Sequence, residues 1–141
     1  MKSKLLVLFA VFLLIVGYAC KKDGNGAKIN GANIVGKWST VKTVMHYEKD
    51  TTINGTASDY YNFAADGSLT VQDHYNGVLT GIYSQTSSNK VGITIYTVDG
   101  HGLGVTTPPS VYTISSLGAN NITITSPTNP AGQEIVYLQK N

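Results

Sequence analysis

The chain of 141 residues contains no arginine, which bears directly on the partners that it can bind. Arginine supplies the planar guanidinium group that recognises phosphates, and nucleic-acid-binding proteins usually concentrate positive charge in a basic stripe. The ten lysines of this chain are scattered and form no such stripe. The sequence therefore argues against nucleic acid as a partner.

Cysteine is almost as scarce, since Cys20 is the only one. A single thiol cannot form an intramolecular disulfide, so the fold must depend on its apolar core and on hydrogen-bonded sheet. Cys20 stands where a charged start (Lys2 and Lys4) and an apolar run over residues 5–16 give way to polar residues 21–23. This arrangement is typical of an export signal that ends in a lipid-acceptor cysteine.

The sequence also lacks a long hydrophobic run, because residues 5–16 fall short of the ~20 apolar residues that a helix needs to span a bilayer. Residues 16–20 (Val-Gly-Tyr-Ala-Cys) resemble a bacterial lipobox, although Gly17 replaces the usual leucine and bulky Tyr18 follows it. Ordinary cleavage to a soluble secreted protein remains the alternative, since Gly17 and Ala19 also satisfy the small-residue rule. In either case removal of residues 1–19 leaves eight lysines against eight carboxylates, a net charge near zero.

The mature chain divides into two parts. Residues 20–33 combine the lipidated N-terminus with a segment rich in Lys, Gly, Asn and Ala, which predicts a flexible tether of roughly 20 Å. Residues 34–141 form the folded domain. Short runs rich in Val, Ile, Thr and Tyr recur there at intervals of about a dozen residues, with turn residues between them and no convincing helical period. The pattern predicts an all-β, eight-stranded antiparallel up-and-down barrel with strands over residues 37–47, 59–63, 68–75, 78–85, 91–98, 110–117, 121–125 and 133–140.

The clearest predicted turn is Asn76-Gly77, because type I′ turns need positive φ at both central residues and these two residue types tolerate it best. The resulting register pairs Tyr75 with Val78 and Val71 with Ile82, and it places all four on the interior face. Asp73 lies on the same face, where its burial would be costly without a partner. Asp73 either fixes a ligand inside a cavity or, near the strand end, reaches solvent or a neighbouring hydroxyl group.

The connections between the predicted strands differ in length at the two ends of the meander. Long connections over residues 48–58, 99–109 and 126–132 fall at one end, and short links fall at the other. The end with long connections is predicted to be a mouth, where ligands of small barrels bind, and the end with short links is predicted to be a closed floor. Because the first strand starts at the floor, we expect the mouth to point away from the membrane.

Several motifs resemble the short lipocalin-like lipoproteins of Bacteroidetes-type bacteria. Gly36-Lys37-Trp38 is similar to the Gly-x-Trp motif that opens the first lipocalin strand, and residues 60–69 are similar to the aromatic strand, Asp-Gly turn and strand of these proteins. Residues 20–23 also resemble their mature N-terminus. The resemblance implies a lipocalin-like barrel in which Trp38 plugs the closed end, with Lys140 in place of the usual stacking arginine.

Residues with catalytic or metal-binding potential form no recognisable set. His46, His74 and His101 lack metal-ligand spacing, and no nucleophile elbow or paired base is visible. We therefore expect no enzyme activity, no metal and no cofactor. The glycine-rich segment 100–104 is not followed by a predicted helix that would hold a phosphate group, so it is interpreted as a mouth loop.

The leading hypothesis is a lipid-anchored protein of the bacterial cell envelope whose barrel binds a small apolar ligand. Lys21 after Cys20 resembles lipoproteins sent to the outer membrane. The alternative is a structural or protein-interaction lipoprotein whose interior is fully packed, and interior volume distinguishes the two. The residues expected to point inward and contact the ligand are Trp38, Leu69, Val71, Asp73, Tyr75, Ile82, Ile93 and Ile95.

Overall fold

The structure is a computed structural model, and it describes residues 28–29, 32–104, 109–130 and 132–140. The predicted signal peptide, the cleavage site and Cys20 lie outside these residues. Within the predicted tether, β1 (Lys28–Ile29) pairs antiparallel with β2 (Ala32–Asn33), which the composition of that segment did not indicate.

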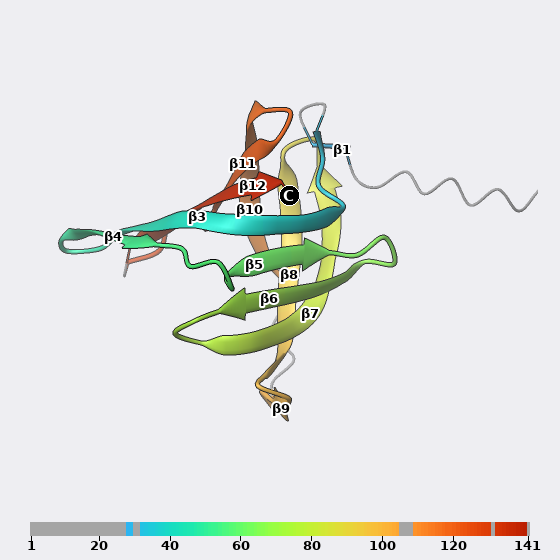
Figure 1. The fold of residues 1–141 in the computed structure, drawn as a ribbon, viewed down its shortest axis with the longest axis horizontal. Helices are drawn as coiled ribbons and strands as arrows, with labels where there is room; N and C mark the ends of the chain where they lie inside the picture. Colours follow the sequence, from blue (N-terminus) through green and yellow to red (C-terminus); the bar gives the residue numbers. More distant parts are fainter. Residues whose placement is uncertain (1–27, 30–31, 105–108, 131, 141) are drawn as a thin grey trace, which may run out of the picture.

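The described part of the chain forms a closed barrel of eight antiparallel strands (Figure 1), which confirms the predicted fold class. Each strand pairs with the next along the chain, and β8–β10 and β12–β3 pairings complete the closure. Closure leaves the barrel no long unpaired edge, so the backbone N–H and C=O groups of the wall pair with neighbouring strands. The barrel strands are β3 (Gly36–His46), β5 (Tyr60–Phe63), β6 (Ser68–Asp73), β7 (Gly77–Ser87), β8 (Lys90–Val98), β10 (Ser110–Gly118), β11 (Asn121–Thr125) and β12 (Gln133–Lys140).

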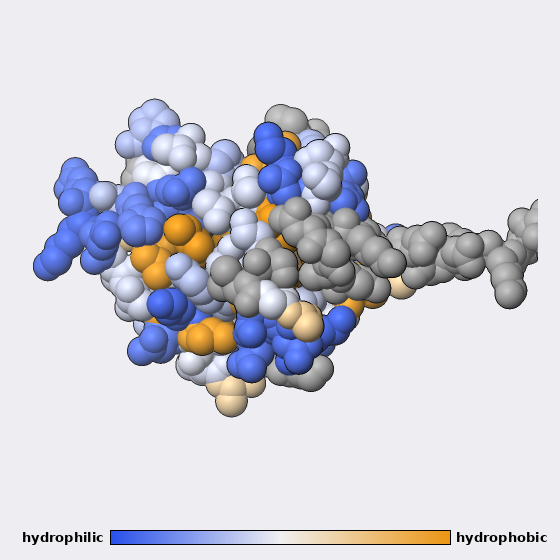
Figure 2. Space-filling view, turned by 90° about the horizontal axis from the view of Figure 1, so that it is seen from above, coloured by the Kyte–Doolittle hydropathy of each residue, from blue (hydrophilic) through white to orange (hydrophobic). Residues whose placement is uncertain are grey.

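Two further strands lie in segments expected to be loops. β4 (Asp50–Asn54) pairs with the second half of β3, because β5 pairs only with its first four residues. β9 (His101–Gly102) adds a short hairpin to β8. Both strands extend the wall at the end where the long connections lie, and Figure 2 shows the β3–β4 hairpin as a hydrophilic arm that projects from the molecule.

The predicted register of the β6–β7 hairpin is wrong. Asp73 pairs with Gly77 and Val71 with Leu79, so three residues form the turn instead of two. Asp73 Oδ1 accepts hydrogen bonds from the backbone N–H groups of Tyr75 and Asn76, at 2.7 and 2.9 Å, and Gly77 takes the positive φ of 75° that the turn requires. An aspartate side chain that satisfies turn amides in this way stabilises the longer turn.

The register change reverses the faces of β7, because side chains alternate along a strand. Leu79 and Tyr83 point inward, whereas Ile82, expected inside, is 47% exposed on the outer surface. Tyr75, also expected inside, lies in the turn and is 70% exposed. Gly81 faces the neighbouring strand so closely that a Cβ atom there would overlap with the carbonyl of Thr94.

The core fills the closed end of the barrel. Trp38 is fully buried, and its indole Nε1 donates a 2.7 Å hydrogen bond to the carbonyl oxygen of Ile34. The Lys140 ammonium lies 5.3 Å from the centre of the Trp38 ring, a cation–π contact of the kind expected. The other side chains at most 1% exposed are Phe63, Leu69, Val91, Ile114, Ile122 and Leu138, together with Ile34. Since Ile34 lies two residues before β3 begins, the chain enters the barrel at this closed end.

Candidate functional site at the open end of the barrel

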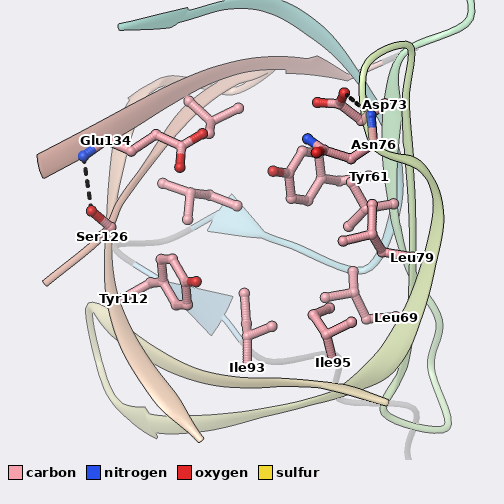
Figure 3. Close-up of a pocket in the computed structure, with 13 residues that line it drawn as sticks. Tyr61, Leu69, Asp73, Asn76, Leu79, Ile93, Ile95, Tyr112, Ser126 and Glu134 are labelled. Carbon is pink, nitrogen blue, oxygen red and sulfur yellow. Dashed lines mark hydrogen bonds between the residues drawn. The ribbon is translucent and has the colours of Figure 1, made fainter. Parts of the chain in front are cut away.

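The interior is packed at the closed end but hollow towards the other, where a cavity of about 180 Å³ remains (Figure 3). Its walls come from β5, β6, β7, β8, β10, β11 and β12, so nearly the whole barrel contributes. Buried side chains of the packed core lie beneath it, and Leu79 points into it from β7. The lining residues are Tyr61, Leu69, Val71, Asp73, Asn76, Leu79, Ile93, Ile95, Tyr112, Ile124, Ser126, Glu134 and Val136.

The cavity is apolar in its depth and polar at its rim. Aliphatic side chains of β6, β7, β8, β11 and β12 form the lower wall. In Figure 3 the hydroxyl groups of Tyr61 and Tyr112 and the carboxylate of Glu134 point into the space above them. An apolar hollow with a few convergent polar groups is the usual form of a small-molecule site, in which the walls provide affinity and the polar groups fix orientation.

The ionisable groups at the rim affect one another. Burial raises the pKa of Glu134, and the negative charge of Asp73 adds to this effect. Burial likewise raises the pKa of the Tyr61 and Tyr112 hydroxyl groups, with Glu134 as the next contributor to each. The rim is therefore a place of low solvation where an additional negative charge is disfavoured.

The backbone around Glu134 is fixed by the chain that precedes β12. The Glu134 N–H donates to Ser126 Oγ at 2.8 Å, and the Ser126 N–H donates to the Glu134 carbonyl oxygen, also at 2.8 Å. These reciprocal bonds hold the end of β11 against the start of β12. Consequently the Glu134 side chain projects from an ordered position rather than from a free loop end.

A second, more open hollow of about 300 Å³ adjoins the cavity. It lies between the β3–β4 hairpin and the β6–β7 turn, and it shares Asp73, Asn76 and Glu134 with the cavity. The same three residues thus face both spaces, and they form the boundary between the barrel interior and its outer rim.

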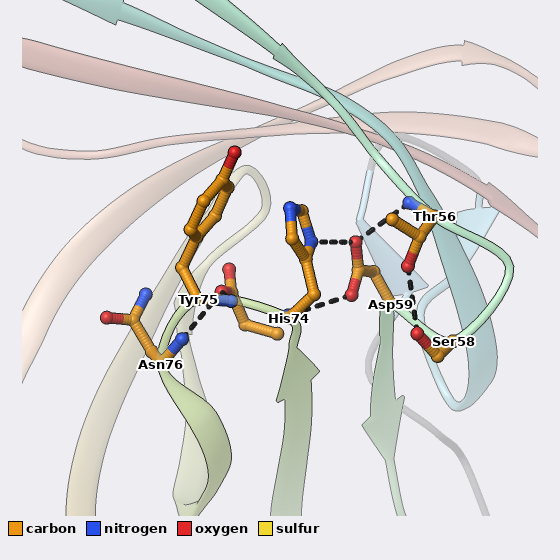
Figure 4. Close-up of polar contacts among 7 residues, drawn as sticks. Thr56, Ser58, Asp59, His74, Tyr75 and Asn76 are labelled. Carbon is orange, nitrogen blue, oxygen red and sulfur yellow. Dashed lines mark hydrogen bonds and ion pairs between the residues drawn. The ribbon is translucent and has the colours of Figure 1, made fainter.

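A buried carboxylate holds the β6–β7 turn in place at this rim (Figure 4). Asp59 is 3% exposed and accepts hydrogen bonds from the Thr56 N–H at 2.8 Å, the His74 N–H at 2.9 Å and His74 Nδ1 at 2.6 Å. The His74 ring also lies against Tyr75, with 4.0 Å between ring centroids. Asp59 therefore links the start of β5 to the turn that carries Asp73 and Asn76.

The structure brings together five of the residues expected to contact a ligand. Leu69, Val71, Asp73, Ile93 and Ile95 all line the cavity. Asp73 also takes part in the turn, where its carboxylate accepts hydrogen bonds from backbone amides, partners that neither interpretation from the sequence named.

Three expected residues do not reach the cavity. Trp38 lies in the packed core beneath it. The expectation that Tyr75 and Ile82 point inward is wrong for the register reason given above. Cys20 lies outside the described residues.

Other lining residues were missed from the sequence, chiefly Tyr61, Tyr112 and Glu134. Glu134, Val136 and Leu138 alternate along β12 and share its inner face, so period-two alternation was an available signal for Glu134. A charged residue at such a position is read as solvent-facing unless the closure of the barrel is known.

The described part of the chain offers no metal site. Its histidines, aspartates and glutamates nowhere gather in threes in a way that would hold a metal ion. No helix in that part is long and apolar enough to span a membrane. Comparison with known proteins found no matching family model, no matching curated protein and no matching solved structure.

Proposed function

We propose that this protein is an exported lipoprotein of the bacterial cell envelope whose barrel binds a small, largely apolar molecule. The single observation that supports binding is the cavity at the open end, with an aliphatic wall and polar groups confined to the rim. A void of this kind is the exception in protein interiors, which otherwise pack as densely as organic crystals.

The volume limits the ligand to a compact molecule. Drug-sized sites are usually ~300–1,000 Å³, whereas an engineered cavity of ~150 Å³ accepts benzene. At about 180 Å³ the cavity suits a body the size of roughly one ring, with room for more in the adjoining hollow. We propose binding rather than catalysis, with neither a cofactor nor nucleic acid involved.

The anchor and the site are proposed to lie at opposite ends. Cys20 would carry the acyl chains that hold the protein on the membrane, and β3, the first strand of the barrel, begins at the closed end. Two or more acyl chains suffice for stable membrane attachment. The open end would then face away from the membrane, which we place at the outer membrane.

Native mass spectrometry of residues 31–141, purified gently from the producing organism, tests the binding proposal. This fragment contains every barrel strand and every core side chain named above. We expect a co-purified small mass that is lost on denaturation. Ile95→Phe, which fills the cavity, should abolish it, whereas Ile82→Phe on the outer face should not. A clean mass that takes up nothing from a lipid extract of that organism would instead favour the packed structural or interaction lipoprotein.

The anchor is tested separately. Cells fed an alkyne-tagged palmitate should label the wild-type protein and not Cys20→Ser, and the variant should move from the membrane fraction to the soluble fraction. An unlabelled wild-type protein would point to ordinary signal cleavage.

A further inference from the structure

The charged groups around the cavity all have the same sign. Among the 13 lining residues, Asp73 and Glu134 are carboxylates, and lysine, arginine and histidine do not occur. The two other acidic groups of the lining, Tyr61 and Tyr112, contribute aromatic rings beside these carboxylates. A ligand that enters the cavity therefore meets negative charge and π faces at its rim and hydrocarbon below.

Glu134 lacks a counter-charge in the described part of the chain. Its side chain makes no hydrogen bond or ion pair with any residue described there, although its backbone is held by Ser126. Asp73 Oδ1 accepts the hydrogen bonds of the two turn amides, and its carboxylate lies at the same rim. Burial and the neighbouring Asp73 carboxylate both disfavour the ionised form of Glu134, and a cation bound at the rim would offset that cost.

A metal ion fits this rim poorly. Calcium takes six to eight oxygen ligands, and magnesium retains several of its waters. The cavity offers only a few oxygen atoms above an aliphatic wall. An organic ammonium group fits better, because it needs fewer hydrogen-bond acceptors, benefits from aromatic faces and carries its own apolar body.

We propose that the ligand is a small amine whose ammonium group lies at the rim by Glu134 and Asp73 and whose apolar body, about one ring in size, occupies the cavity against Leu79, Ile93 and Ile95. This inference rests on the proposed function, since it assigns a chemical class to the ligand of the same cavity. Tyr61 and Tyr112 flank the ammonium group, and Ser126 and Asn76 are available to accept its remaining hydrogen bonds.

Three probes with one ring and different end groups test the inference: phenethylamine, 2-phenylethanol and 3-phenylpropionate. Each is titrated calorimetrically into the full chain in neutral detergent, with detergent-only titrations subtracted. Glu134→Gln removes the charge with little change in shape. Asp73→Asn keeps an oxygen for the turn and serves as an independent second variant. Glu48→Gln, on the exposed β3–β4 connection, is the matched control. Far-UV circular dichroism verifies that each variant is folded.

We expect phenethylamine to bind at least about tenfold more tightly than 2-phenylethanol, and the propionate to bind least, because a charge-assisted hydrogen bond adds that much. Glu134→Gln should remove this preference and leave the binding of the alcohol almost unchanged, while Glu48→Gln should alter neither. If the alcohol or the propionate binds as well as the amine, or if Glu134→Gln and Asp73→Asn both keep the preference, the amine assignment is overturned while the binding barrel stands. If none of the three probes binds and no mass co-purifies, the proposed function fails as well.

Discussion

Replacing Asp59 with alanine should destabilise the barrel more than any other change to a carboxylate at its rim. The side chain accepts hydrogen bonds from two backbone N–H groups and from His74 Nδ1, and it is almost completely buried. A hydrogen bond to a charged group contributes ~1.5–3 kcal/mol, and part of this is recovered when water reaches the freed amides. We therefore expect Asp59→Ala to lower the free energy of unfolding by about 2–4 kcal/mol at pH 7.

Asp50→Ala is the matched control, because Asp50 also bonds to a histidine, His46, at 2.9 Å but is exposed. Exposed pairs of this kind contribute ~0–1 kcal/mol, so the control should change stability little. Urea unfolding followed by fluorescence measures both variants, since Trp38 is the only tryptophan and is fully buried. A loss below about 1 kcal/mol for Asp59→Ala, or equal losses for the two variants, would refute this reasoning.

The stability difference between wild type and Asp59→Ala should also depend on pH. Burial alone would raise the pKa of Asp59, but the hydrogen bonds from Thr56 and His74 outweigh it and hold the pKa below the ordinary 3.8. Because the folded pKa is the lower one, the ionised carboxylate favours folding. Its contribution is complete above the unfolded pKa and is lost as the pH falls through the folded pKa. The stability difference between wild type and Asp59→Ala should thus be constant near neutrality and shrink below about pH 4.

Three further changes test the core, the wall and the rim. Trp38→Ala should lower the free energy of unfolding by about 3–5 kcal/mol, measured by circular dichroism, because Trp38 is fully buried. Val41→Ala, on the exposed face of the same strand, should change it by no more than about 0.5 kcal/mol. Equal effects would contradict the assigned faces of β3. Gly81→Val should lower the free energy of unfolding by more than about 2 kcal/mol, because its Cβ would overlap with the backbone of β8. Gly102→Ala is the control, because a Cβ there would contact no other atom. A tolerated Gly81→Val would count against the close approach of the two strands. Burial raises the pKa of Tyr61, so stability should fall as the pH rises above 10, and it should fall less steeply in Tyr61→Phe; identical slopes in alkaline unfolding curves would place the hydroxyl group in water.

Local patterns were sufficient to predict the strands. All eight barrel strands lie where short β-branched and aromatic runs are bounded by turn residues, with ends displaced by at most a few residues. Alternation also predicted the inward positions on β6 and β8, since Leu69, Val71, Ile93 and Ile95 repeat at every second residue of their strands. Those signals are local, because the period of a strand and the chemistry of a turn depend on neighbouring residues.

The tertiary structure decided what local patterns leave open. Asn76-Gly77 predicted a two-residue turn, but the Asp73 side chain stabilises a three-residue turn, and the shifted register moves Ile82 from the inside to the outside. The cavity depends on how much of the interior the inward side chains fill once the barrel closes, which is a sum over seven strands. Glu134 and Tyr112 lie more than a third of the barrel sequence away from Asp73 and Tyr61, and they meet them at one rim only because β12 and β10 complete the same closed wall. The sequence by itself thus determined the strands and their order, whereas the register, the void and the charge of its rim follow from long-range packing.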